Sequence, residues 1–450
     1  MASSPSPSQD LRPNESIFHN RQFMLLWAAQ FLTQTAQQAI WFGMIIVVEQ
    51  VSRSSLHLSI ALLSTVIPGV IFGLFAGVVV DRSNKKTVLV AANFLRAPIV
   101  FGYLLYSHSL LAVYAVNFVF VGVSQFFGPA EASSIPALVG KRQLVAANSL
   151  FNLTFTISQL VGIVLLAPWV IKFAGAPTLF VVVGLMYLVG GMLTTFLPRG
   201  IEPERSLSTL RGPMIVRVIG VELAEAGRFI RRDRQTWWSM IFVTTSSTLM
   251  LVLAMLAPRY VVAEIGIQPE DAVFLVAPAG LGILLMSLVM ARLARRFGEI
   301  RLSIAGGMLA GIAVVGLGVL PRLSGLLAKG VASTIGLMVP LDGPQALIPG
   351  LMIISAGIGM GVALTNIPAQ SVLMDRAPIA SRGRIFAVLL MLGNVAAIAP
   401  LAFLGVLADV YGVPTIVSIV GFSILVVAVL AIRAGVAADP NGPSGRVRST

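Results

Sequence analysis

The stretch Gly77-Val78-Val79-Val80-Asp81-Arg82-Ser83-Asn84-Lys85-Lys86 lies between two long apolar runs, residues 57–80 and 87–106. Each run is close to the length of about 20 residues that an α-helix needs to cross the hydrocarbon core of a bilayer. A short turn rich in cations between two such runs is typical of a loop on the cytoplasmic face of a membrane. The stretch therefore predicts two membrane-spanning helices joined by a tight cytoplasmic loop.

Runs of the same kind continue on both sides of this loop. They cover residues 23–50, 57–80, 87–106, 110–128, 148–171 and 178–198 in the first half, and 237–262, 272–291, 302–320, 348–371, 384–408 and 413–432 in the second. Of the 450 residues, 57% are hydrophobic and 11% are charged, and the mean hydropathy is +0.91. A soluble domain has about a quarter of its residues charged, and the alternating segments of a membrane β-barrel are absent from the sequence. We predict an all-α integral membrane fold with twelve transmembrane helices in two pseudo-symmetric six-helix bundles.

Lysine and arginine are concentrated in alternate loops, and this asymmetry sets the predicted orientation. By the positive-inside rule both termini are cytoplasmic, as expected of a multi-pass protein of the plasma membrane. The predicted domains are a tail at 1–22, a bundle at 23–198, a linker at 199–236, a second bundle at 237–432 and a tail at 433–450. Residues 216–232 of the linker form either a solvated helix or a helix that lies on the membrane surface.

The composition also argues against other classes of function. The net charge of +13 is spread over the loops and no nucleic-acid motif accompanies it, so no nucleic-acid partner is expected. The chain has no cysteine, and His19, His57 and His108 fall at or beyond the membrane boundaries without metal-ligand spacing. No repeated pore loop or ring of charges indicates a channel. We expect neither an enzyme nor a metal or cofactor site, but a monomer that binds a small-molecule substrate and membrane lipid.

Corresponding features recur in the same order in the two halves, which predicts two bundles of like orientation. Residues 77–86 align with residues 291–300, so that Asp81 corresponds to Arg295. Pro129-Ala130-Glu131-Ala132 likewise aligns with Pro368-Ala369-Gln370-Ser371. The offset between the halves grows from the first match to the second because the loop at about 321–347 is longer than its counterpart at 107–109.

Across residues 77–89 the chain resembles the major facilitator superfamily, whose loop between helices two and three carries the pattern G-x-L-a-D-r-x-G-r-k-x-x-l. Asn84 stands in place of the family's second glycine, and asparagine is the next-best residue for a left-handed turn. The resemblance implies a gate formed by Gly77, Asp81, Arg82, Lys85 and Lys86. Gly77 would allow close helix approach, and Asp81 would meet a helix terminus or a cation of the other half. The alternative is a turn that carries only positive-inside charges.

Four further stretches resemble the branch that contains macrolide-efflux and enterobactin-exporter proteins. They are residues 127–130, 135–139, 146–150 and 382–387. The resemblance implies a secondary active transporter that exports an amphipathic small molecule, such as a macrolide-like drug or a siderophore, by alternating access with protons as the coupling ion. The alternatives are a lipid or lysophospholipid carrier and a non-transporting sensor with the same fold.

Two charges fall within the apolar runs or at their edge. Arg96 follows Lys86 by ten residues, so a helix places it about 15 Å deep, near the membrane midplane. It would bind an anionic substrate group or pair with Glu131 in one state of the transport cycle, or it is a static cation satisfied by carbonyls and water. Glu131 is predicted at the inner end of the fourth helix, either facing the mouth of a cavity or as a plain interfacial carboxylate.

Polar uncharged side chains mark a candidate substrate cavity. Gln30, Gln34, Gln37 and Trp41 recur at near-helical spacing on one face of the first helix. Shorter stripes are formed by Asn117 with Ser124, Thr244 with Thr248, and Asn366 with Gln370. The resemblance implies that the helices that carry these stripes surround a central cavity, and amides beside an indole ring suit large amphipathic molecules. In the other interpretation these side chains hydrogen-bond between helices as packing contacts.

Overall fold

The computed structural model describes residues 17–107, 109–139, 143–198, 233–323, 347–376 and 382–436. Within these ranges, twelve helices are long and apolar enough to cross a membrane, which confirms the predicted fold class. The predicted tails, most of the linker with residues 216–232, and most of the loop near 321–347 lie outside the described residues.

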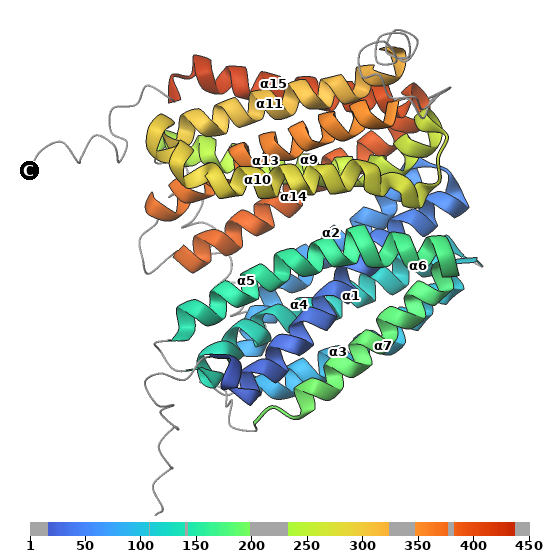
Figure 1. The fold of residues 1–450 in the computed structure, drawn as a ribbon, viewed down its shortest axis with the longest axis vertical. Coiled ribbons are helices and arrows are strands. Elements are labelled where there is room, and N and C mark those ends of the chain that lie inside the picture. Colours follow the sequence, from blue (N-terminus) through green and yellow to red (C-terminus); the bar gives the residue numbers. More distant parts are fainter. Residues whose placement is uncertain are drawn as a thin grey trace, which may run out of the picture. The chain divides into compact units, whose positions relative to one another are not determined.

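The first six spans are built from seven α-helices and one π-helix. They are α1 (Arg21–Ser52), α2 (Ser55–Asp81), α3 (Lys85–Phe101), α4 (Leu110–Leu138), α5 (Leu144–Leu160) continued by η4 (Val161–Leu166) and α6 (Ala167–Ala174), and α7 (Ala176–Thr195). α3 packs between α4 and α7, and Figure 1 shows α3 running alongside α7. These three helices position the buried charges described below.

The last six spans repeat this arrangement. They are α9 (Arg234–Tyr260) continued by η6 (Val261–Ile265), α10 (Val273–Phe297), α11 (Glu299–Val319), α13 (Ile348–Arg376), α14 (Arg382–Tyr411) and α15 (Val413–Arg433). α13 packs against both α10 and α11, and α11 also packs against α15 (Figure 1).

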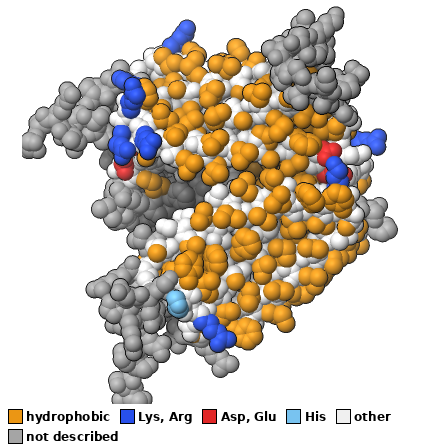
Figure 2. Space-filling view, in the orientation of Figure 1, with side chains coloured by type: hydrophobic (Ala, Val, Ile, Leu, Met, Phe, Trp, Pro, Cys, Tyr) orange, Lys and Arg blue, Asp and Glu red, His pale blue; other side chains and the backbone are white. Residues whose placement is uncertain are grey.

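The surface of these helices is apolar along their length. In the face shown in Figure 2, hydrophobic side chains cover the flanks of the helices, whereas the lysines and arginines gather near helix ends. Large side chains such as Phe173, Leu288 and Ile353 are each 73% exposed. A soluble monomer rarely exposes apolar patches of this extent, so these flanks are the lipid-facing surface of the spans.

The chain divides into two compact units whose bounds differ from the predicted bundles in one respect. The first unit comprises Met1–Met44 and Ile71–Ile215, and the second comprises Ile45–Val70 and Val216–Thr450. Residues 45–70, predicted in the first bundle, belong to the second unit, in which they bond to α9 and α14. Glu49 pairs with Arg259, and Asp409 accepts a hydrogen bond from the backbone N–H of Ser55 at 2.7 Å.

α4 is longer than predicted. It continues through Pro129 and Pro136 to Leu138 instead of ending near residue 128. Proline is tolerated inside membrane-spanning helices because neighbouring groups satisfy the backbone atoms that it leaves unpaired. Glu131 therefore lies seven residues before the end of the helix, about 10 Å from it at the rise of an α-helix. The predicted place of Glu131 at the inner end of the helix was wrong.

Asn84 also differs from its predicted conformation. It is extended (φ −66°, ψ 115°) rather than left-handed, and its side-chain oxygen accepts a hydrogen bond from the backbone N–H of Thr87 at 3.2 Å. This is the geometry of a helix N-cap, for which asparagine is among the preferred residues. Asn84 therefore starts α3 and does not replace a glycine turn.

Asp233 starts α9 in the same way, since its carboxylate accepts hydrogen bonds from the backbone N–H and the hydroxyl of Thr236. It also pairs with Arg376 at the end of α13 at 2.5 Å. Burial alone would raise the pKa of Asp233, but the hydrogen bonds from Thr236 and Arg376 outweigh burial and hold the pKa below its ordinary value. The ionised carboxylate thus ties α9 to α13 within the second unit.

Candidate functional site

The five residues predicted to form a gate lie where α2 ends and α3 begins. Lys85 donates a hydrogen bond through Nζ to the carbonyl oxygen of Asp81 at 2.8 Å, and Lys86 Nζ donates to the carbonyl oxygen of Leu197, just beyond α7. Cations near the last carbonyls of a helix are favourable because these carbonyls carry partial negative charge. The two lysines thus fix the loop to the ends of α2 and α7.

Asp81, Arg82 and Gly77, the other three residues of the predicted gate, make fewer contacts. The Asp81 side chain is exposed, and one guanidinium nitrogen of Arg82 is buried without a hydrogen-bond partner among the described residues. A methyl group added at Gly77 would meet no atom within 4 Å. Among the described residues no helix approaches Gly77 closely, and the gating role of Asp81 stays a prediction.

The polar face of α1 divides into two kinds of side chain. Gln30 is 5% exposed and donates a long hydrogen bond to the carbonyl oxygen of Phe151 on α5, at 3.5 Å. Gln37 accepts one from the hydroxyl of Tyr187 on α7 at 3.4 Å. Gln34 and Trp41, like Gln37, are only partly buried. Gln30 is thus mainly a packing contact, while Gln34, Gln37 and Trp41 leave part of the face open.

The shorter stripes on the other helices are largely satisfied inside their own units. Asn117 is 2% exposed and accepts a hydrogen bond from the hydroxyl of Tyr103 at 2.7 Å. Asn366 donates to the hydroxyl of Ser246 on α9 at 2.8 Å and accepts from Gln370 one turn further along α13. These contacts agree with the interpretation in which the polar side chains hydrogen-bond between helices as packing contacts.

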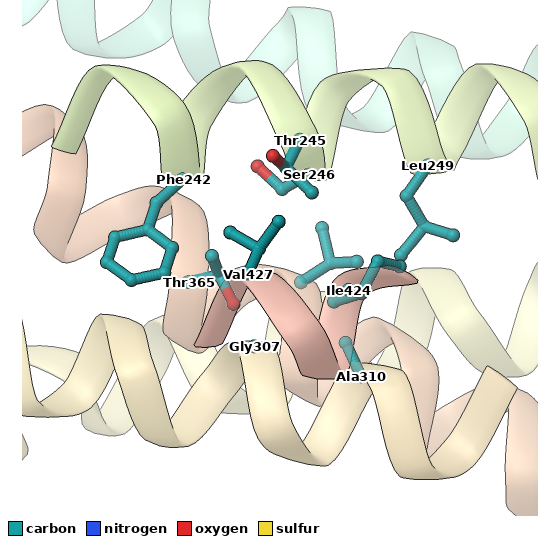
Figure 3. A pocket seen from close by; sticks show the side chains of 10 residues that line it. Phe242, Thr245, Ser246, Leu249, Gly307, Ala310, Thr365, Ile424 and Val427 are labelled. Atoms are coloured by element: carbon teal, nitrogen blue, oxygen red, sulfur yellow. The ribbon is translucent and has the colours of Figure 1, made fainter. Parts of the chain in front are cut away.

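A small pocket lies within the second unit, beside the predicted stripe on α9 (Figure 3). Its lining includes Phe242, Thr245 and Ser246 from α9, Gly307 and Ala310 from α11, and Ile424 from α15. The predicted Thr244 and Thr248 are not among its lining residues, because they lie on the adjacent face of α9 and are half-buried there. The hydroxyl of Ser246 already donates to the carbonyl oxygen of Val243 at 3.0 Å, so the pocket offers little free polar surface.

Arg96 lies in the interior of the first unit and is 3% exposed. Its guanidinium donates to the side-chain oxygen of Asn93 at 2.7 Å and to the carbonyl oxygen of Ala92 at 3.3 Å. The guanidinium carbon also lies 4.3 Å from the ring centroid of Phe127 and 4.8 Å from that of Tyr187. A cation between two aromatic faces is held electrostatically, the more strongly because it is desolvated. Arg96 is thus held by α3, α4 and α7 together.

Glu131 lies close enough to Arg96 for their charges to interact. They are nevertheless not among the ion pairs found between described residues, which are Glu49 with Arg259 and Asp233 with Arg376. One carboxyl oxygen of Glu131 is buried and has no hydrogen-bond partner in the described part of the chain. A buried polar atom without a partner is costly and marks a position that needs an explanation.

Sequence reasoning did not identify Tyr187, which connects this charge pair to α1. Its ring packs on Arg96, and its hydroxyl donates to Gln37. Lying in an otherwise apolar run, Tyr187 carries no motif of its own. The signal that could have found it is the internal repeat, because only one half has a tyrosine at this place. The structure thus links Glu131, Arg96, Tyr187 and Gln37 across four helices.

Comparison with known proteins agrees with this architecture. Residues 26–398 match the Major Facilitator Superfamily. A relative in Bacillus subtilis (strain 168), "Uncharacterized MFS-type transporter YfiS", is 24% identical over 406 residues, which are 88% of this chain and 89% of the relative. A second relative in that strain, "Uncharacterized MFS-type transporter YkuC", is 28% identical over 153 residues, 33% of this chain and 35% of the relative.

Solved structures show the same fold. A point mutant of the nucleoside transporter NupG superposes with a TM-score of 0.70 over 92% of this chain and 99% of that one, at 14% identity. A POT family transporter in complex with a thioalcohol-conjugated peptide gives a TM-score of 0.69 over 92% and 96%, at 13% identity. At these identities the likeness concerns the fold alone. From the match over most of its length, its twelve spans and these folds, the chain belongs to the Major Facilitator Superfamily and is a multi-pass membrane transporter.

Proposed function

We propose that this transporter exports amphipathic small molecules by alternating access, with protons as the coupling ion, from a monomer in the plasma membrane whose termini are both cytoplasmic. The observation that carries the proposal is the face of α1 where Gln34, Gln37 and Trp41 are only partly covered. Polar groups on a spanning helix avoid lipid and line protein interfaces or cavities. Two amides beside an indole ring suit a ligand that has both a polar group and a large apolar surface.

Export is supported by the resemblance of residues 127–130, 135–139 and 146–150 to macrolide-efflux and enterobactin-exporter proteins. Proton coupling is supported by the carboxyl group of Glu131, one oxygen of which is buried, because ionisable groups inside a membrane are costly and are commonly proton relays. The neutral residues of the α1 face suit a macrolide or a dye better than a small ion.

The test is accumulation of erythromycin and of ethidium in an efflux-deficient bacterial host that expresses the chain. We expect lower accumulation of at least one probe than in the host with an empty vector, and restored accumulation when a protonophore collapses the proton gradient. Membrane insertion is verified by immunoblotting of isolated membranes. Unchanged accumulation of both probes with verified insertion would count against drug export, and a lipid-transport assay with labelled lysophospholipid would then be the next measurement.

Replacement of Asp81 by asparagine is expected to slow ethidium export about tenfold without lowering the amount of protein in the membrane. The Asp81 side chain is exposed here, so the folded state loses little. A charge-assisted hydrogen bond made in another state of the cycle contributes about 1.5 kcal/mol, which corresponds to roughly that factor. Asp375→Asn, which also removes an exposed carboxylate near a helix end, is the matched control and should export normally. Normal export by Asp81→Asn would remove the gating role.

A further inference from the structure

The two halves of the chain can be aligned helix by helix. The alignment shows where the first half has charged or polar side chains and the second half does not. α3 begins at Lys85 and α11 at Glu299, while Pro129 of α4 corresponds to Pro368 of α13. α7 and α15 both follow a glycine with positive φ, Gly175 (φ 81°) and Gly412 (φ 84°), and both carry proline at the second helical position. These landmarks fix the register of three pairs of helices.

In this register the charged cluster of the first unit corresponds to the small pocket of the second. Arg96 aligns with Ala310 and Asn93 with Gly307, and Tyr187 aligns with Ile424. Ala310, Gly307 and Ile424 all line the pocket of Figure 3. The second unit therefore folds with alanine, glycine and some empty space where the first unit places a guanidinium, an amide and a phenol. The fold itself does not require the charges.

The carboxyl group has a neutral counterpart as well. Glu131 aligns with Gln370, whose amide donates to Asn366 one turn earlier on α13. The residue one turn before Glu131 is Phe127, which offers its ring to Arg96 and no hydrogen-bond acceptor. The first unit thus holds a carboxyl group that its own helix does not satisfy, at a place where glutamine is compatible with the fold.

Resting on the proposed function, we infer that Glu131 carries the transported proton and that Arg96 transmits its charge state through Tyr187 to the α1 substrate face. When Glu131 is ionised, it attracts the guanidinium of Arg96. When its carboxylate takes up one proton and becomes neutral, that attraction is lost, and Arg96 is held by Asn93, Ala92 and the two rings alone. Because Tyr187 contacts both Arg96 and Gln37, the change reaches the predicted binding face.

The surroundings favour a proton over a cationic group of a substrate. The carboxyl oxygen of Glu131 that has no hydrogen-bond partner among the described residues is buried, and the neighbouring cation Arg96 would repel a second organic cation. The titratable groups between the helix ends of the described first unit, besides Glu131, are Arg96, Lys172 near the end of α6 and the phenols of Tyr103, Tyr114 and Tyr187. α1 between Arg21 and Glu49, and all of α5, bring none. Arg96 is the one described charge that interacts electrostatically with Glu131.

The first arm of the test needs no substrate. Purified full-length protein in liposomes is examined by infrared difference spectroscopy between two pH values, which detects the carbonyl stretch of a carboxyl group that gains a proton. We expect a band of a buried carboxylic acid in the wild type that is lost in Glu131→Gln and retained in Glu264→Gln, a carboxylate near the end of the α9 span. If Glu131→Gln fails to insert, Glu131→Asp is used, and its band should shift.

The second arm uses ethidium in the same liposomes. In the wild type an imposed pH gradient should drive ethidium accumulation; in Glu131→Gln that accumulation should be lost, whereas ethidium should still equilibrate down its own gradient. Gradient-driven accumulation in Glu131→Gln at the wild-type level would overturn the inference and leave the proposed function standing. A carboxyl group that stays ionised at every pH, and whose removal abolishes ethidium binding, would overturn it in favour of a cationic substrate site. A band that depends on Glu131 without any ethidium transport would support the proton site and contradict the proposed drug substrate.

Discussion

Replacement of Gly359 by alanine is expected to destabilise the second unit by about 1–3 kcal/mol, the usual cost of overpacking a filled core, and replacement by leucine to prevent its folding. A Cβ at Gly359 would lie 1.9 Å from the carbonyl oxygen of Ala279 on α10. On the facing helix, a Cβ at Gly282 would lie 2.2 Å from the carbonyl oxygen of Ala356 on α13. Both obstacles are backbone atoms, so the two helices would have to move apart.

The measurement is the unfolding midpoint of the detergent-solubilised protein, followed by size-exclusion chromatography after heating. Gly357→Ala is the matched control on the same helix, because its Cβ would meet the Cβ of Ala313 at 3.7 Å, an ordinary contact. We expect this control to unfold like the wild type. A Gly359→Leu protein of normal abundance and midpoint would show that α10 and α13 do not pack this closely in the membrane.

The sequence predicted the spans well because the membrane sets a simple criterion. Every polar backbone group in lipid must be bonded within a helix, so each apolar run of sufficient length becomes one. Errors arose at helix ends, where hydropathy changes gradually. The apolar run ends near residue 128, yet α4 continues through Pro129 and Pro136 to Leu138, because a proline in a membrane helix does not have to end it.

The candidate site was harder to predict because it depends on contacts between helices. The depth of Arg96 could be derived from its distance along the chain to Lys86, but its partners on α4 and α7 could not. Phe127 and Tyr187 are apolar or nearly so, and hydropathy treats them as ordinary membrane residues. Gln30 and Gln37 share one face of α1, and only the structure shows that Gln30 is buried against α5 while part of Gln37 stays open.

The sequence did not predict the ion pair made by the last turn of α1. Glu49 lies in the last turn of α1, and a carboxylate at the end of a membrane-spanning helix suggests a solvated group. Glu49 is instead 1% exposed and pairs with Arg259 at 3.3 Å. Sequence separation of 210 residues hides such a pair from any local pattern.

Replacement of Arg259 by glutamine is expected to destabilise the second unit by about 3 kcal/mol, because it leaves the carboxylate of Glu49 buried without its partner. The second carboxyl oxygen of Glu49 already lacks a hydrogen bond among the described residues. Arg259 is 27% exposed, which places the effect at the low end of the range for buried pairs. Glu49→Gln combined with Arg259→Gln should recover most of the loss, since no buried charge then remains. The unfolding midpoints of the two single variants and the double variant form a cycle that isolates the pair.

Arg322→Gln, which removes an exposed arginine, is the control and should stay within about 0.5 kcal/mol of the wild type. The same result for Arg259→Gln would contradict a structural role for the pair.

A second measurement tests the role of the pair in the transport cycle. The pair and Asp409 bind residues 45–70 to α9 and α14. A state of the cycle that separates these elements must therefore break both contacts. The chain has no cysteine, so a single Ser59→Cys, at a position 1% exposed and bonded to Met255, reports such separation without background. A membrane-impermeant maleimide should label this cysteine faster when Arg259→Gln is added, and equal rates would mean that the pair stabilises the unit without holding it closed.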